Sequence, residues 1–230
     1  MGETIEFASN GGHAHGYLAV PSGGSSGTIA VLVIQEWWGL VDQIMRTCDR
    51  FAEAGFTALA PDLYGGTAVP LTEPDEAAKH MMALEMDAAA RHLSGAVDEL
   101  LRRTGAPSVG VVGFCMGGGL ALVLATQRPD AVAAVVPAYG VIPWPDAQPD
   151  YGAMSAVVEG HVAELDSSFS PAAADALVAE LAALGKSASF HLYPGCDHAF
   201  FNEDRPEVYD SGAAALLWER TVSFLRARLG

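Results

Sequence analysis

The sequence predicts an α/β protein with a doubly wound, mostly parallel sheet and helices on both faces. Short apolar runs alternate with longer stretches in which apolar residues recur every three or four positions, a pattern typical of repeated βα units. The 230 residues are 50% hydrophobic, which is enough for a large buried core. No internal repeat, charge run or low-complexity linker interrupts them. We therefore expect a single domain over residues 1–230.

In the first half of the chain, Thr4–Phe7 and Tyr17–Val20 are expected to form an antiparallel pair around a polar bend from Asn10 to Gly16. The continuous apolar run Ile29–Gln35 predicts a strand buried on both faces. Helical spacing begins at Val41 and stops at Gly55. The expected elements that follow are a strand at Phe56–Ala60, ended by Pro61-Asp62, and a helical stretch from Asp75 to Arg103 in two pieces.

The second half continues the alternation of strands and helices. Prolines at 143, 145 and 149 predict a loop in its middle, and Pro171 suits the first turn of a helix. The expected strands are Ser108–Phe114, Ala131–Ala138, Ala156–His161 and Ser187–Tyr193, and the expected helices are Met116–Gln127, Pro171–Leu184 and roughly Pro206 to Leu229.

The composition excludes several classes of function. With 12 basic and 28 acidic residues the formal net charge is −16, which disfavours nucleic acid and anionic membranes as partners. No apolar run is long enough to span a bilayer, and the first ten residues lack the order of a signal peptide. The three cysteines are far apart, so we expect no disulfide framework and a cytoplasmic location. The histidines outside the candidate site lack metal-ligand spacing, so we expect neither a metal nor a cofactor.

The most informative stretch is the turn from the strand at Ser108–Phe114 into the helix at Met116–Gln127. Gly113-Phe-Cys-Met-Gly117 has the form glycine, any residue, nucleophile, any residue, glycine, with Cys115 as the nucleophile. Such a turn lifts the sulfur above the sheet at a helix N-terminus, where negative charge is favoured. Alternatives are a buried, inert thiol or a dinucleotide-binding turn, although the latter would need glycine at 115.

A base and an acid follow in the chain order that α/β-hydrolases use. His198 lies just past the last expected strand, and Asp166 lies just past the strand before it. Both therefore lie at the sheet edge where Cys115 is expected, and Asp166 can fix the imidazole tautomer. Taken singly, His198 is a surface or capping residue as readily as a base, and Asp166 is a helix start. Glu164 is the second candidate for the acid.

These residues resemble the dienelactone hydrolase family, also called carboxymethylenebutenolidases, over essentially the whole chain. The motifs that carry the resemblance are Gln35-Glu-Trp-Trp-Gly39, Ala60-Pro-Asp-Leu-Tyr64, Gly113-Phe-Cys-Met-Gly-Gly118 and Gly195-Cys-Asp-His-Ala-Phe200. The resemblance implies an α/β-hydrolase fold and hydrolysis of a cyclic enol-lactone that carries a carboxylate. The reaction would pass through a thioester at Cys115.

The resemblance also implies roles for residues outside the triad. The backbone N–H groups of Trp37 and Met116 would form the oxyanion hole, and Glu36 would accept a hydrogen bond from the Cys115 thiol in the resting enzyme. A carboxylate there disfavours the thiolate until substrate displaces it. The residues expected to contact substrate are Trp38, Tyr64, Tyr139, Phe200 and Arg205.

The chain departs from the family where dienelactone-cleaving members use arginines to bind the substrate carboxylate. The segment after Tyr64 offers only Lys79 and His80, and Arg205 lies slightly beyond the expected position. The leading hypothesis is therefore a cofactor-free lactone or small-ester hydrolase, a monomer or small homo-oligomer. The alternatives are a broad carboxylesterase or thioesterase with another substrate, a non-catalytic ligand-binding relative, and a redox protein that uses Cys115 and Cys196.

Overall fold

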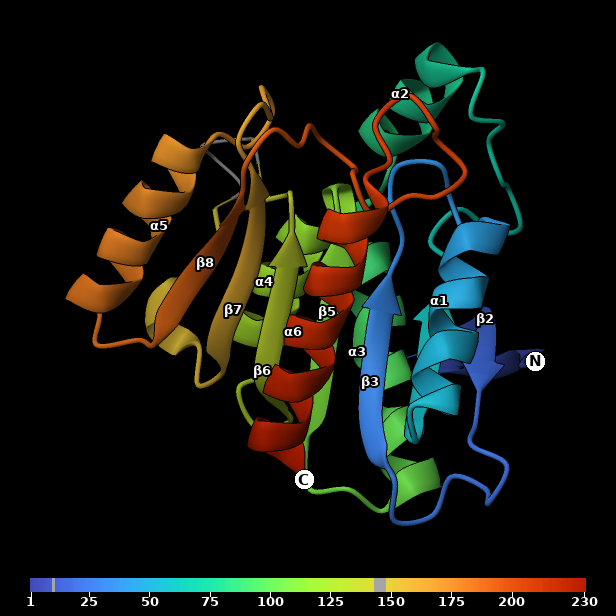
Figure 1. Ribbon diagram of the computed structural model, residues 1–230. Coiled ribbons are helices and arrows are strands. Elements are labelled where there is room, and N and C mark those ends of the chain that lie inside the picture. Colours follow the sequence, from blue (N-terminus) through green and yellow to red (C-terminus); the bar gives the residue numbers. More distant parts are fainter. Residues whose placement is uncertain (10, 143–147) are drawn as a thin grey trace. The chain divides into compact units, whose positions relative to one another are not determined.

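The computed structural model describes residues 1–9, 11–142 and 148–230 (Figure 1). The chain divides into two compact units, Met1–Val111 and Val112–Gly230, and each is described by itself. The expectation of one domain over the whole chain stays a prediction. Asn10, where the predicted bend begins, and Pro143 and Pro145 in the predicted loop lie outside the described residues.

The first unit contains a four-stranded arrangement in the order β1-β2-β4-β3. Its strands are β1 (Glu3–Ser9), β2 (Gly12–Ala19), β3 (Ile29–Ile34) and β4 (Phe56–Pro61). The pairs β1–β2 and β2–β4 are antiparallel, whereas β3 and β4 are parallel. Its helices are α1 (Asp42–Glu53), α2 (Pro74–Met82) and α3 (Met86–Thr104), which confirms the two expected pieces. Helix α1 packs on β4 and β2, and α3 lies behind the strands in Figure 1.

The expected polar bend from Asn10 to Gly16 is wrong, because β2 already begins at Gly12. His13 pairs with Ala8 in the ladder, and His15 pairs with Glu6. Their exposed imidazoles lie beside the Glu6 carboxylate, at 3.2 Å for His13 Nδ1. The polar residues therefore occupy the solvent face of an edge hairpin, where a strand requires only every second side chain to be apolar.

The second unit carries strands in the order β5-β6-β7-β8, and the boundary between the two units falls within β5. These strands are β5 (Val109–Phe114), β6 (Val132–Ala138), β7 (Val157–Ala163) and β8 (Ala188–Tyr193), and β6, β7 and β8 run parallel. The helices are α4 (Met116–Gln127), α5 (Pro171–Ala183) and α6 (Ser211–Leu229), with a short 3₁₀ turn η2 (Tyr151–Ala153). In Figure 1, α6 crosses in front of β6 and α4 lies behind it.

The start of the last helix differs from expectation by more than the usual uncertainty of helix and strand ends, and the end of β7 differs by two residues. The last helix begins at Ser211 and not near Pro206, because the Asp210 side chain caps it by accepting a hydrogen bond from the Ala213 N–H at 2.8 Å. Strand β7 continues two residues past His161, to Ala163. Asp166 therefore follows the strand end by only three residues. Among the described helices, none combines the length and the apolarity that crossing a membrane requires.

Candidate active site

The turn from β5 into α4 has the geometry of a nucleophile elbow. Strand β5 is completely buried, and Cys115 follows it with φ 54° and ψ −121° at the N-cap position of α4. A non-glycine residue with positive φ is uncommon and strained, and such residues gather at functional sites. A Cβ at Gly113 would lie 1.9 Å from the carbonyl oxygen of Gly117, so the turn can close only with glycine at 113. The strained backbone of Cys115 and the close approach of Gly113 to Gly117 therefore place Cys115 at the tip of the turn between β5 and α4.

The end of β6 supports this tip from the side. The Cys115 N–H donates to the Ala138 carbonyl oxygen at 3.0 Å, and a Cβ on Gly140 would lie 1.8 Å from the Cys115 carbonyl oxygen. Between them, Tyr139 has φ 41° and is completely buried. The glycine at 140 is therefore required by the close approach of the elbow.

His198 and Asp166 form a tight pair beside Cys115. His198 Nδ1 lies 2.8 Å from Asp166 Oδ2, and the Asp166 side chain is completely buried. The other oxygen, Oδ1, accepts hydrogen bonds from the backbone N–H groups of Ser168 at 2.7 Å and Phe169 at 3.0 Å. The imidazole also shares a side-chain hydrogen bond with Cys115. The carboxylate is thus fixed by three donors, and the imidazole joins it to the thiol.

The electrostatics of His198 follow from these bonds. Burial alone would lower its pKa, but the hydrogen bonds to Asp166 and Cys115 and their charges outweigh burial and raise the pKa of His198 to about 10. Beside a Cys115 thiolate, the imidazole is therefore protonated at neutral pH. A protonated imidazole hydrogen-bonded to a thiol group is the arrangement that stabilises a thiolate.

Glu164, the second candidate for the acid, does not occupy the position beside the imidazole. Its Oε2 accepts a hydrogen bond from the Gly195 N–H at 2.8 Å. The nearby Leu165 N–H donates to the Cys196 carbonyl oxygen at 2.9 Å, so both bonds tie the loop after β7 to the turn after β8. These bonds bring the Asp166 and His198 loops together.

Aromatic side chains pack beside His198. The Tyr139 ring lies 5.2 Å from the imidazole in an edge-to-face arrangement, and the Phe200 ring lies 5.6 Å from Tyr139. Both side chains are completely buried, so they offer no exposed surface in this structure, and Tyr139 lies between the imidazole and Phe200 in the series of ring contacts. Arg205 Nε donates to Glu207 Oε1 at 2.9 Å. The expected contacts of these three residues with substrate stay predictions.

The candidates in the first unit lie where β3 ends and in the segments that follow. Glu36 is 2% exposed, so its carboxylate is buried and is not a solvated loop group. The rings of Trp37 and Trp38 meet edge to face at 5.1 Å, and Trp38 packs in a small core cluster. Tyr64 stacks on His80 at 5.2 Å.

Residue types alone do not predict two features of the site. Gln35 is completely buried, and its Oε1 accepts a hydrogen bond from the Leu63 N–H at 3.3 Å while its Nε2 has no partner among the described residues. Tyr139 adopts a left-handed conformation that its residue type does not favour. The only sequence signal for it was the Tyr139-Gly140 pair directly after a strand. No group of three or more metal-ligating side chains occurs within the described ranges.

A thiol on a strained strand-to-helix elbow, joined through an imidazole to a buried carboxylate at the ends of parallel strands, defines the site of an α/β-hydrolase. The dienelactone hydrolase family model matches residues 14–229. The chain is 36% identical to "Protein usf" of Aquifex pyrophilus and 33% identical to the "Putative carboxymethylenebutenolidase" of Aquifex aeolicus, in both cases over 100% of each chain. This chain belongs to the dienelactone hydrolase family.

Solved structures show the same fold. The "Putative Dienelactone Hydrolase from Klebsiella pneumoniae" superposes with a TM-score of 0.85 at 24% identity, over 98% of this chain and 99% of that one. An acylaminoacyl peptidase of Pyrococcus horikoshii superposes with a TM-score of 0.74 at 14% identity, over 100% of this chain and 42% of that one. The predicted α/β-hydrolase fold is confirmed. The protein is a carboxylic ester hydrolase of the carboxymethylenebutenolidase type.

Proposed function

We propose that this enzyme opens a lactone or a small carboxylic ester through a thioester on Cys115, with His198 as the acid and base and Asp166 as its positioning carboxylate. The observation that carries the proposal is the continuous hydrogen-bonded sequence from Cys115 through His198 to Asp166 at the elbow. All three groups are present and joined, so a non-catalytic relative is not proposed. The three cysteines are free, and we propose the reducing cytoplasm as the location.

The reaction proceeds in two halves. In the first, the Cys115 thiolate attacks the carbonyl carbon, the bond from that carbon to the ring or alkoxy oxygen breaks, and the His198 imidazolium gives its proton to the leaving oxygen. In the second, His198 takes a proton from water, the resulting hydroxide attacks the thioester, and the carbon–sulfur bond breaks to restore the thiolate. In a lactone the leaving oxygen stays attached to the acyl chain, so a single hydroxy or oxo acid is released.

Negative charge develops on the carbonyl oxygen in both halves. Met116, directly after the nucleophile, is the first residue of α4, and a helix N-terminus favours negative charge. We assign the first oxyanion donor to its N–H. The family resemblance supports the Trp37 N–H as the second donor, in the strand-to-helix segment after β3 where related enzymes place it.

The substrate is proposed to be a lactone or short ester without a strong requirement for a carboxylate. The observation behind this is that Arg205, the one arginine near the end of the His198 segment, is already paired with Glu207. A broad carboxylesterase or thioesterase activity is the second candidate. A panel of dienelactone, neutral lactones, short acyl esters and acyl thioesters distinguishes these substrate classes.

The thioester is tested by quenching the enzyme in acid during turnover of a p-nitrophenyl ester and measuring its intact mass. We expect one added acyl group per chain, located by peptide mapping on Cys115, because thioesters survive acid. The Cys196→Ala variant is the matched control and should carry the same adduct. An adduct on Cys48 or Cys196, or a burst of p-nitrophenol with no adduct on Cys115, would contradict the proposal.

Glu36 is proposed to hold the resting thiol uncharged until substrate displaces it, when the thiol proton passes to His198 and gives the thiolate beside an imidazolium. The burial of this carboxylate supports the proposal, because a buried charge is normally paired with a donor. Glu36→Gln should make Cys115 react faster with iodoacetamide in the absence of substrate, while turnover falls. Mass-spectrometric mapping of the label over the three cysteines measures this. Rapid labelling of Cys115 in the unmodified protein, at a rate that the variant does not change, would end the idea.

A further inference from the structure

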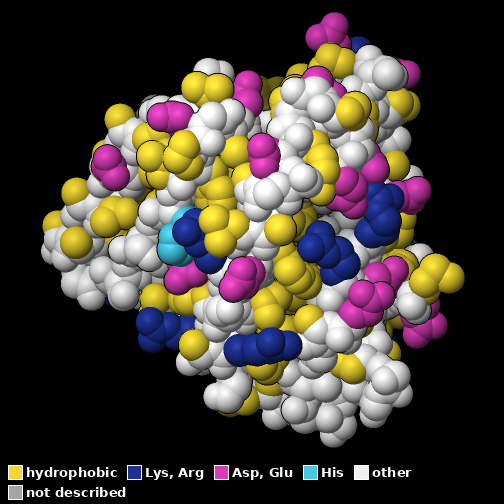
Figure 2. Space-filling view, in the orientation of Figure 1, with side chains coloured by type: hydrophobic (Ala, Val, Ile, Leu, Met, Phe, Trp, Pro, Cys, Tyr) yellow, Lys and Arg dark blue, Asp and Glu magenta, His cyan; other side chains and the backbone are white. Residues whose placement is uncertain are grey.

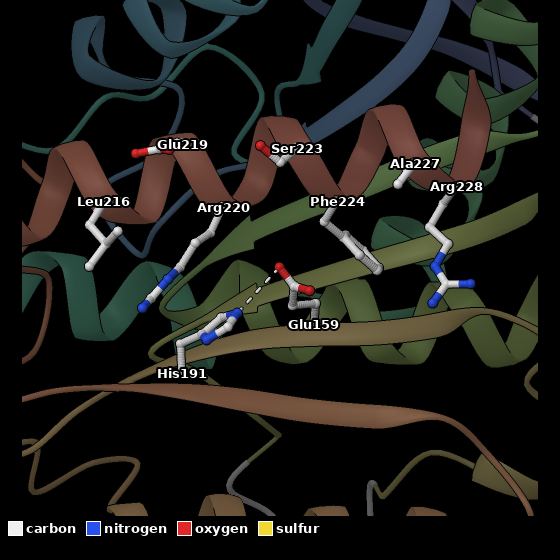
Figure 3. Close-up of a pocket in the computed structure, with 9 residues that line it drawn as sticks. All are labelled: Glu159, His191, Leu216, Glu219, Arg220, Ser223, Phe224, Ala227 and Arg228. Atoms are coloured by element: carbon white, nitrogen blue, oxygen red, sulfur yellow. Dashed lines mark ion pairs between the residues drawn. The ribbon is translucent and has the colours of Figure 1, made fainter.

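A hydrogen-bonded network joins helix α6 to strands β7 and β8 in the second unit. The Tyr193 hydroxyl lies 2.9 Å from His161 Nδ1, and His161 Nε2 lies 3.1 Å from Thr221 Oγ1. Arg220 forms a side-chain hydrogen bond with the Tyr193 hydroxyl, and its guanidinium lies 5.3 Å from the centroid of that ring. In Figure 3 Arg220 reaches from α6 toward the strands. The hydrolytic mechanism uses none of these four residues.

The direction of each hydrogen bond follows from the chemistry of the groups. A guanidinium can only donate, so the Tyr193 oxygen accepts from Arg220. Burial raises the pKa of Tyr193, so the hydroxyl keeps its proton at neutral pH and donates it to His161 Nδ1. Burial, followed by the charges of His191 and Arg220, holds the pKa of His161 well below its usual range. The imidazole is therefore neutral, and its Nε2 carries the proton and donates to Thr221 Oγ1.

The network is enclosed by the protein. His161 is completely buried, and Thr221 and Tyr193 are almost completely buried. Figure 2 shows acidic, basic and hydrophobic side chains interspersed on the surface over the region of α6. The charged pair beside His161 is Glu159 with His191, whose Oε1 and Nε2 lie 3.4 Å apart (Figure 3). Breaking a bond of the network would leave a buried polar group unsatisfied, so the hydroxyl and the imidazole are held in one geometry.

The Tyr193 ring is the first in a series of aromatic contacts that ends at His198. The centroids of the Tyr193 and Phe200 rings are 4.7 Å apart. Phe200 packs on Tyr139, and Tyr139 packs on the His198 imidazole, at 5.6 and 5.2 Å. The His161 carbonyl oxygen also accepts a hydrogen bond from the Tyr139 N–H at 2.8 Å. The network therefore holds both the rings and the backbone against which His198 packs.

The backbone around His198 requires such support. Ala199, directly after it, has φ 65° and is 1% exposed. A left-handed conformation in a residue other than glycine costs energy and persists only where the surroundings enforce it. Before His198, the Cys196 N–H donates to the Tyr193 carbonyl oxygen at 3.4 Å, and after it Phe200 packs on the Tyr193 ring. Tyr193 thus contacts the His198 turn on both sides.

We propose that Tyr193 is a positioning residue for His198. Its hydrogen-bonded hydroxyl fixes the ring, and the ring fixes the turn that carries the imidazole. A displacement of about 1 Å in an active site can cost about 10²-fold in rate, so a small shift of this ring is enough to slow proton transfer. The proposal deepens the proposed function, and it rests on His198 as the acid and base.

The test is Tyr193→Phe, which keeps the ring and removes only the hydroxyl. We expect kcat for a p-nitrophenyl ester to fall about 10-fold and KM to stay within about 2-fold, because the imidazole moves and the substrate contacts do not. Burial lowers the pKa of His198, and the hydrogen bonds to Asp166 and Cys115 raise it to about 10. Weaker bonds should therefore make His198 titrate at a lower pH in NMR spectra than in the unmodified protein.

The matched control is Tyr17→Phe in β2 of the first unit. Its hydroxyl accepts from the Gly2 N–H at 2.8 Å and donates to Asp49 Oδ1 at 3.0 Å, so this variant also loses the hydrogen bonds of a tyrosine hydroxyl. Both variants should lower the midpoint of thermal unfolding, because each leaves former partners of the hydroxyl unpaired. Only Tyr193→Phe should change kcat and the titration of His198. Equal kcat and equal His198 titration in the two variants would overturn the positioning role.

The partner of the hydroxyl supplies a second test that does not depend on the folding of Tyr193→Phe. The amide of His161→Asn can accept from the Tyr193 hydroxyl, whereas the side chain of His161→Leu cannot. His161→Asn should therefore keep a higher kcat than His161→Leu, and equal values would overturn the proposal. Unchanged kcat in Tyr193→Phe, together with loss of activity in Asp166→Asn, would overturn the positioning role alone. Full activity in Asp166→Asn would instead count against the proposed function itself.

Discussion

Cys115→Ala is expected to lower kcat/KM for every substrate of the enzyme by at least about 10⁴-fold, since removing a nucleophile leaves only the smaller contributions of binding and oxyanion stabilisation. Alanine fits at the tip of the elbow, because it keeps the Cβ of Cys115 and removes only the sulfur. The fold should therefore persist. Steady-state kinetics with a p-nitrophenyl ester, together with far-UV circular dichroism, separate loss of chemistry from loss of structure.

The matched control is Cys196→Ala, which removes a second thiol from the turn that precedes His198. Burial raises the pKa of Cys196, so this thiol is poorly suited to attack a carbonyl carbon. We expect activity within about 3-fold of the unmodified enzyme, as for a small buried side chain that fills space. Retention of activity by Cys115→Ala, or its loss in Cys196→Ala alone, would show that the nucleophile has been assigned to the wrong cysteine. It would also revive the redox interpretation.

Asp166→Asn is expected to lower kcat by about 10²–10⁴-fold. The amide oxygen can still accept from Ser168 and Phe169, but the NH₂ group that replaces Oδ2 cannot accept a hydrogen bond from His198 Nδ1. The wrong tautomer of His198 is then favoured. Glu164→Gln makes the same carboxylate-to-amide change in the same loop and should retain activity, because the Glu164 carboxylate accepts from the backbone N–H of Gly195 in the turn after β8 and not from His198.

The same variant tests the charge state of the imidazole. His198 in the unmodified protein has its pKa raised to about 10, against an ordinary value of 6.5. A raised pKa means that protonation stabilises the folded state fully below pH 6.5, and that this stabilisation disappears as the pH rises from 6.5 towards 10. Asp166→Asn should bring the pKa down. The difference in free energy of unfolding between the two proteins should therefore shrink over that interval, as measured by urea denaturation at a series of pH values. The assignment is wrong if NMR shows His198 titrating at the same pH in both proteins.

Sequence alone was sufficient where a local pattern has one physical solution. The alternation of apolar runs and helical stretches predicted the strands and helices of both units to within a few residues. Apolar residues recur every 3.6 positions on the buried face of a helix, and short continuous apolar runs mark buried strands, whichever elements pack against them. The position of the elbow was equally predictable from the sequence. Two glycines, Gly113 and Gly117, that flank Cys115 directly after a buried strand are typical of this tight strand-to-helix turn. Chain order then ranked His198 and Asp166 as partners.

Only the tertiary structure determined which of two nearby carboxylates lies beside His198. It also determined whether a polar stretch forms a bend or a strand. Asp166 and Glu164 differ by two positions, and only the backbone path after β7 directs one to His198 and the other to Gly195. The polar stretch after Asn10 has the composition of a bend, but pairing with β1 makes it a strand. The left-handed conformation of Tyr139 has only the Tyr139-Gly140 pair as a sequence signal, because it arises where the end of β6 packs against the Cys115 turn.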